Sequence, residues 1–83
     1  MPIAREALSD REWACLAYLS DKMEANAKMI GEAIAPTLTK RGQLTIAHRA
    51  VTRLHDLCCL SHLPDLDAWR LSALGRDTYQ QGK

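Results

Sequence analysis

The segment from Leu44 to Leu57 carries the most regular pattern of apolar and polar residues in the chain. At about 100° per residue, its apolar side chains fall within one arc of about 140°. These are Ile46, Ala47, Ala50, Val51, Leu54, Leu57 and the adjoining Cys58. Polar and charged side chains occupy the opposite side, namely Thr45, His48, Arg49, Thr52, Arg53 and His55. The pattern predicts a helix over 44–57 that buries one face in a core and turns a cationic face to solvent.

Two shorter helices are expected before this segment. Ser9 and Glu12 have the spacing of a capping box, in which each side chain accepts a hydrogen bond from the other residue's N–H. A helix is therefore predicted over 10–20. A second helix would start after Asn26, a suitable N-cap, and stop before Pro36, which cannot continue a helix comfortably. Its apolar residues are Met29, Ile30, Ala33 and Ile34.

The remaining segments are expected to be turns, a hairpin and a last helix. Residues 21–26 are polar enough for a turn, and residues 36–43 contain Thr37, Thr39 and Gly42, which favours an irregular loop. The order predicted after the long helix is a strand over 58–63, a turn over 64–67, a strand over 68–71, and a helix that starts after Ser72 and runs to about Gln80.

Composition restricts the class of protein. The chain has 83 residues, of which 47% are hydrophobic and 25% charged, so we expect one globular domain over 1–83. Cys15, Cys58 and Cys59 are odd in number and two are adjacent, which indicates free thiols in a reducing compartment. No apolar run is long enough for a membrane span, and the N-terminus lacks a secretory pattern. These features predict a cytoplasmic location and no membrane partner.

The positive charge is concentrated in one part of the chain. The formal net charge is only +1, yet residues 33–55 contain no acid. That stretch contains four bases, Lys40, Arg41, Arg49 and Arg53. A local cationic surface of this kind attracts anionic partners such as nucleic acid.

Residues 71–76, Leu-Ser-Ala-Leu-Gly-Arg, resemble the Leu-Thr-x-x-Gly-Arg-like helix start that follows the wing in bacterial winged helix-turn-helix regulators. The order of three helices, a hairpin and a last helix is similar to that family as well. The resemblance implies a mainly α fold with a small β-hairpin: a three-helix core, a two-stranded wing and a C-terminal helix. It also implies that the helix over 44–57 is a recognition helix for double-stranded DNA.

Two features depart from the family pattern. The predicted loop from Pro36 to Gln43 is longer than the roughly three or four residues that usually join the two helices of the motif, so either the turn is enlarged or it contains a short helix. The predicted wing carries Asp65 and Asp67, where a wing that contacts DNA would normally carry Lys or Arg. The tip of this wing should therefore repel phosphate.

The leading hypothesis is a transcriptional regulator that binds DNA through the long helix. Arg reads guanine in the major groove, and the side chains just before a recognition helix are placed to contact phosphates. The candidate DNA-binding residues are Lys40, Arg41, Gln43, Thr45, His48, Arg49, Thr52 and Arg53. One helix with an acidic wing offers few phosphate contacts, so useful affinity would require a homodimer on two half-sites. Exposed apolar residues such as Leu19 or Tyr79 are candidates for that contact, and no cofactor is expected.

The alternative hypothesis is a protein-interaction module. A winged-helix scaffold can bind another protein, as in small inhibitors or adaptors, including phage-encoded ones. The near-neutral net charge and the acidic wing favour this alternative, whereas Arg49 and Arg53 favour DNA.

Metal binding and catalysis are weaker interpretations. His55, Cys58, Cys59 and His62 are zinc-ligand types, but neighbouring residues in a strand point to opposite faces, so the two thiols are expected to be buried instead and no metal is predicted. No local arrangement supplies a thiol with an orienting base, so the chain is not expected to be an enzyme. Trp13 and Trp69 are expected to belong to the core.

Overall fold

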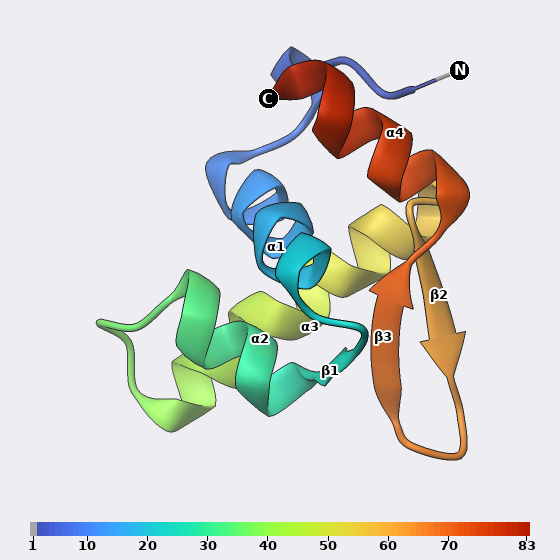
Figure 1. Ribbon diagram of the computed structural model, residues 1–83. Helices are drawn as coiled ribbons and strands as arrows, with labels where there is room; N and C mark the ends of the chain where they lie inside the picture. Colours follow the sequence, from blue (N-terminus) through green and yellow to red (C-terminus); the bar gives the residue numbers. More distant parts are fainter. Residues whose placement is uncertain (1) are drawn as a thin grey trace.

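The computed structural model describes residues 2–83, which form four α-helices, a short 3-10 helix and a three-stranded antiparallel sheet (Figure 1). In chain order these elements are η1 (Arg5–Ala7), α1 (Asp10–Asp21), β1 (Ala25–Asn26), α2 (Ala27–Ile34), α3 (Lys40–Asp56), β2 (Leu60–Leu63), β3 (Ala68–Leu71) and α4 (Ala73–Gly82). The expectation of a mainly helical chain with a β-hairpin is confirmed.

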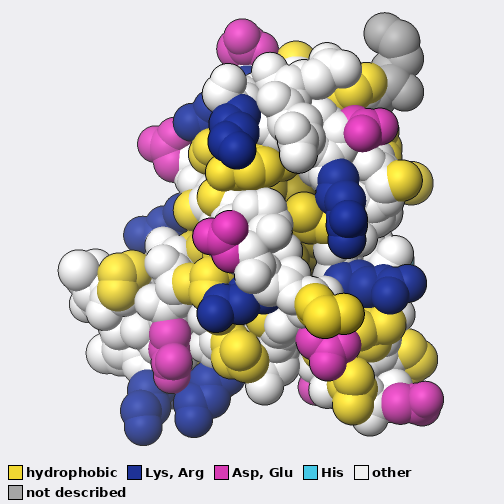
Figure 2. All heavy atoms as spheres, in the orientation of Figure 1, with side chains coloured by type: hydrophobic (Ala, Val, Ile, Leu, Met, Phe, Trp, Pro, Cys, Tyr) yellow, Lys and Arg dark blue, Asp and Glu magenta, His cyan; other side chains and the backbone are white. Residues whose placement is uncertain are grey.

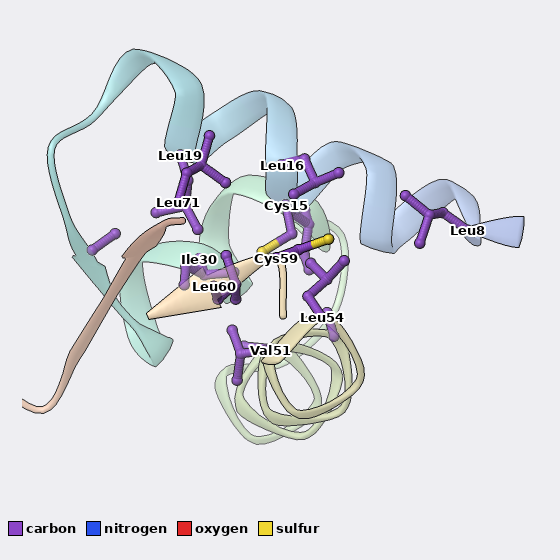
Figure 3. Close-up of a cluster of buried hydrophobic side chains, with 14 of the residues drawn as sticks. Leu8, Cys15, Leu16, Leu19, Ile30, Val51, Leu54, Cys59, Leu60 and Leu71 are labelled. Carbon is purple, nitrogen blue, oxygen red and sulfur yellow. The ribbon is translucent and has the colours of Figure 1, made fainter. Parts of the chain in front are cut away.

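A single cluster of buried side chains joins the helices to the base of the hairpin. Figure 3 shows side chains from α1, α2, α3 and both hairpin strands meeting in this core. Its fully buried members include Cys15, Leu16, Leu19, Ile30, Val51, Leu54 and Cys59. A Cβ added at Gly31 would lie 2.5 Å from the carbonyl oxygen of Gln43, so α2 and α3 can pack this closely because Gly31 has no side chain. The core fixes α3 along one side of its length.

Two of the predicted helix starts are confirmed in detail. The Ser9 side chain accepts from the Glu12 N–H, and the Glu12 carboxylate accepts from the Ser9 N–H at 2.8 Å. The Asn26 side chain accepts from the Met29 N–H at 2.9 Å. The first helix extends one residue beyond the predicted end, to Asp21.

The sheet contains a strand that the sequence did not predict. β3 lies between β1 and β2, and Ala25 and His62 both lie opposite Trp69. The expectation of a turn over the whole of 21–26, and of a sheet with two strands, was therefore wrong. β1 has only two residues, too few to show an alternating pattern, and its strand character comes from pairing with β3.

The long helix begins four residues earlier than expected. The Thr39 side chain accepts from the Gly42 N–H at 3.1 Å, and the Thr39 carbonyl accepts from the Gln43 N–H at 2.8 Å. This N-cap starts α3 at Lys40, so the predicted loop over 36–43 and the predicted helix start at Leu44 were wrong. The prediction placed both Thr39 and Gly42 in the loop, whereas Thr39 caps the helix and Gly42 lies in its first turn. The connection between α2 and α3 is correspondingly short.

The corner between α3 and β2 also differs from the prediction. The Cys58 N–H donates to the His55 carbonyl at 2.9 Å, and the Cys59 N–H donates to the Leu54 carbonyl at 2.8 Å. These bonds form a Schellman motif, with Cys58 at the left-handed position (φ 65°) that usually holds glycine. The predicted strand over 58–63 therefore starts only at Leu60. Cys59 is buried as expected, but Cys58 is exposed, which contradicts its expected burial.

The last helix packs beside the N-terminal segment. Ser72 caps α4, as predicted, by accepting from the Gly75 N–H at 3.1 Å, and α4 continues past the predicted end to Gly82. The Ile3 N–H donates to the Thr78 hydroxyl at 3.0 Å. Within residues 2–83, no helix has the length and apolar character that a membrane crossing requires.

Candidate nucleic-acid interface

Five of the candidate DNA-binding residues lie on one exposed side of α3, which we call the outer face. They are Arg41, Thr45, His48, Arg49 and Thr52. The opposite side of the helix is buried and carries Ala47, Ala50, Val51 and Leu54. At a rise of about 1.5 Å per residue, the outer face extends over about 16 Å of helix. An exposed helix side of this length is compatible with a major groove about 12 Å wide.

Arg49 is at the middle of the exposed part of α3. It forms no salt bridge with any residue in 2–83, so its guanidinium is available to an external acceptor. A shallow hollow of about 430 Å³ lies next to it on α3. The residues that line the hollow are His48, Arg49, Thr52, Arg53 and Asp56.

Arg53 differs from Arg49, because it contacts the start of α1. Its Nη2 donates to the Ala7 carbonyl at 3.3 Å, and its Nη1 lies 3.9 Å from Oε2 of Glu12. The Arg53 side chain is 52% exposed and that of Glu12 is 12% exposed. The pair therefore contributes little stability, about 0–1 kcal/mol for an ion pair of this kind. The main effect of the pair is to orient the Arg53 side chain, because its guanidinium lies toward α1 and is partly engaged within the protein.

The first turn of α3 brings two further candidates next to α2. Lys40 and Gln43 line a hollow of about 120 Å³ together with Lys28 and Glu32 of α2. Figure 2 shows Lys and Arg side chains projecting at the lower left, below the start of α3. Lys40 and Arg41 are exposed there. The eight candidate residues thus do not form one patch: five share the outer face, two lie beside α2, and Arg53 lines the hollow beside Arg49 but contacts the start of α1.

Sequence reasoning missed two charged residues near these positions. Asp56 lies on the same side of α3 as Thr52, four residues earlier, and adds a negative charge at the end of the hollow. The helical spacing alone would have revealed it. Lys28 lies beside Lys40, but only the packing of α2 on α3 brings them together.

The hairpin is anchored to the end of α3 by aromatic rings. Trp69 lies between two imidazoles, with ring centroids 4.4 Å from His62 and 5.5 Å from His55. Asp67, in the turn, lies 3.5 Å from Nε2 of His62. The turn also carries Asp65, so the hairpin tip is acidic. Trp69 is half-buried and packs against the core, which agrees with its expected role.

The three thiols have different environments. Burial, together with the nearby Glu12 carboxylate, raises the pKa of Cys15 to about 12. Burial also raises the pKa of Cys59. Cys58 is exposed at the corner after α3. In the part of the chain that the structure describes, no three His, Cys, Asp or Glu side chains gather closely enough to hold a metal ion.

Comparison with known proteins yields no match to any family model, to any curated protein or to any solved structure. The functional interpretation therefore depends on the geometry and chemistry of the residues described above.

Proposed function

We propose that this protein is a DNA-binding regulator that places the outer face of α3 in the major groove of double-stranded DNA. The single observation that carries the proposal is the exposed, cationic side of a long helix whose other side is buried in the core. Arg41 and Arg49 would supply positive charge, while Thr45, His48 and Thr52 would contact base edges or phosphates.

The arrangement of elements supports a winged-helix reading of the same surface. The order α1, β1, α2, α3, β2, β3 and α4 is compatible with a helix-turn-helix followed by a wing. The short connection between α2 and α3 brings the chain closer to the motif than the sequence alone indicated. In this reading α3 is the recognition helix and the β2–β3 hairpin is the wing.

Within this proposal the two arginines have different roles. Arg49 is free to read a base or contact phosphate, whereas Arg53 contacts Glu12 and Ala7. We assign Arg53 to the edge of the interface, where it orients α3 relative to α1 and contacts DNA less than Arg49 does.

The test is a fluorescence anisotropy titration of a random-sequence duplex at two salt concentrations. We expect binding that weakens steeply with salt, because phosphate contacts release counterions. Arg49→Ala should weaken binding to the random duplex and lower the salt slope by about one, as expected for the loss of one phosphate contact. Arg53→Ala should have a smaller effect, and Arg11→Ala, an exposed arginine on α1, is the matched control. Absence of binding at low salt would contradict the proposal.

A second candidate function is a protein-interaction module that does not bind DNA. The observation that favours it is the exposed acidic turn of the hairpin, which would face phosphate in a winged-helix complex. In that case none of the α3 variants would change an association with DNA, because there would be none to measure.

A further inference from the structure

The hairpin has a second face, which is directed away from α3. Alternate residues of a strand point to opposite sides of a sheet. Leu60 and Leu71 enter the core, and Trp69 contacts His55 of α3, so these residues mark the inner face. Ser61 and Arg70, which lie opposite each other in the register, are on the outer face.

A groove lies between the end of α1, the end of β3 and α4, and it continues onto this outer face at Ser61 and Arg70. It consists of two adjoining hollows of about 260 and 440 Å³ that share Leu71 and Arg76. The first hollow is lined in part by the apolar side chains of Leu19, Met23 and Tyr79. The second is lined by Arg70 as well as Arg76. In Figure 2, dark-blue side chains lie over the upper part of β3 and below α4, beside hydrophobic ones.

The groove combines a small apolar area, to which Met23 and Tyr79 contribute, with two unpaired cations. Leu19 and Leu71 form buried parts of its wall, and Met23 at its edge is 91% exposed. Arg70 and Arg76 form no salt bridge with any residue in 2–83. Asp21 and Lys22 also line the first hollow, but their charges cancel. A fitting partner is therefore an apolar side chain flanked by two carboxylates.

The turn of the hairpin presents this combination. Leu66 is 59% exposed and stands between Asp65 and Asp67. Asp67 is 97% exposed even though one of its oxygens lies 3.5 Å from His62, so its other oxygen remains accessible. The turn cannot reach the groove of its own chain, because the four residues of β2 separate them by about 13 Å at 3.3 Å per residue.

We infer that the groove receives the Asp65-Leu66-Asp67 turn of a second copy of this chain. Leu66 packs against Met23 and Tyr79, and the two aspartates pair with Arg70 and Arg76. In a two-fold dimer each contact occurs twice, because each copy offers both the turn and the groove. The two hairpins then run antiparallel, with the tip of one beside the base of the other. This contact leaves the outer face of α3 uncovered and does not depend on DNA binding.

This surface replaces the dimer contact expected from the sequence. Leu19 and Tyr79 were candidates because they were expected to be exposed. Leu19 is instead buried, and Tyr79 is half-buried against Trp13, with ring centroids 5.1 Å apart. Both side chains line the groove but do not project from the surface.

The test is sedimentation equilibrium of the full chain without DNA, over micromolar to millimolar concentrations. We expect a reversible dimer whose dissociation constant rises about tenfold or more in the double variant Arg70→Glu, Arg76→Glu. Leu66→Ser should raise it about tenfold as well. The control is Arg11→Glu, a charge reversal outside the groove, which should leave the dimer unchanged. Circular dichroism of each variant checks that it is folded.

A charge-reversal rescue tests the pairing itself. A chain with Asp65→Arg, Asp67→Arg, Arg70→Glu and Arg76→Glu should dimerise again, because turn and groove are reversed together. A wild-type chain that stays monomeric at all concentrations overturns the inference. So does a dimer that is insensitive to the groove variants, or a folded fourfold variant that fails to recover. These outcomes are separate from the anisotropy test, which measures whether α3 of each copy contacts DNA, whereas the dimer would supply the second half-site contact.

Discussion

α3 and the β2–β3 hairpin follow each other in the chain but differ in charge and in anchoring. α3 is basic along its exposed side and buries Ala47, Ala50, Val51 and Leu54 along the other. The hairpin buries Leu60 and Leu71 at its base and leaves an acidic turn exposed. The exposed charges of the helix would attract an anionic partner, and those of the hairpin tip a cationic one. Acids and bases are almost equal in number, so the formal net charge is only +1 although the two elements differ in charge.

The largest expected effect comes from replacing a buried leucine of α3, compared with an exposed leucine of the hairpin turn. Leu54 is fully buried under α3, so Leu54→Ala should lower the free energy of unfolding by about 2–5 kcal/mol. Leu66→Ala, in the exposed turn, should change it by no more than about 0.5 kcal/mol. Urea denaturation measures both. Equal losses would show that the hairpin tip is as firmly packed as the helix.

The next effect tests why α3 is held so close to α2. Gly31→Ala would place a methyl group 2.5 Å from the Gln43 carbonyl, so it should destabilise the fold by about 1–3 kcal/mol. Gly42→Ala is the control, because its nearest contact is 3.3 Å away, on a Leu38 side chain. Thermal unfolding should show Gly42→Ala as neutral or stabilising by up to about 1 kcal/mol. A neutral Gly31→Ala would mean that the two helices can separate without loss.

The pH dependence of stability tests the burial of the Cys15 thiol in the core. The pKa of Cys15 rises from 9.0 to about 12 on folding, so the unfolded chain loses this proton first as pH increases. Stability from Cys15 is complete below pH 9 and falls between pH 9 and 12, by at most about 1.4 kcal/mol per pH unit. Cys15→Ala should therefore show a shallower decline in this range.

Alkylation gives an independent check on the same thiols. At mildly alkaline pH the native protein should take up one label, at Cys58, and the unfolded chain three. Rapid labelling of Cys15 in the native protein would contradict its burial on the inner side of α1.

The smallest expected effect comes from removing a negative charge beside the outer face of α3. Asp56 is the carboxylate that lines the hollow beside Arg49. Asp56→Asn should strengthen binding to duplex DNA by about two- to fivefold at low salt, because it removes one repulsion from phosphate. Asp77→Asn, an exposed aspartate on α4, is the matched control. Anisotropy titration measures both, and an equal gain in the two variants would point to net charge alone.

Local signals in the sequence were sufficient for most of the fold. The capping box at Ser9 and Glu12, the cap at Asn26 and the cap at Ser72 each depend on residues within one helical turn, and all three were predicted correctly. The start of α3 was missed because the hydroxyl of Thr39 outweighs the helix-weakening Gly42.

The errors elsewhere involve contacts between distant residues. β1 exists because β3 pairs with it, and the exposure of Cys58 follows from its left-handed backbone at the corner. The contact between Arg53 and Glu12 joins residues far apart in the chain, so no periodicity within α3 could have predicted it. The outer face was predictable because helical spacing alone defines it.

The measurement that tests the central claim most directly is a two-dimensional amide NMR titration of the isotope-labelled protein with a short DNA duplex. We predict that the largest shifts occur at the outer face of α3, from Arg41 to Thr52, and at the adjoining start of α2. Residues of the groove on the far side of the hairpin should shift little. Shifts confined to the hairpin and that groove, or no shifts at low salt, would contradict the assignment of α3 as the DNA-binding element.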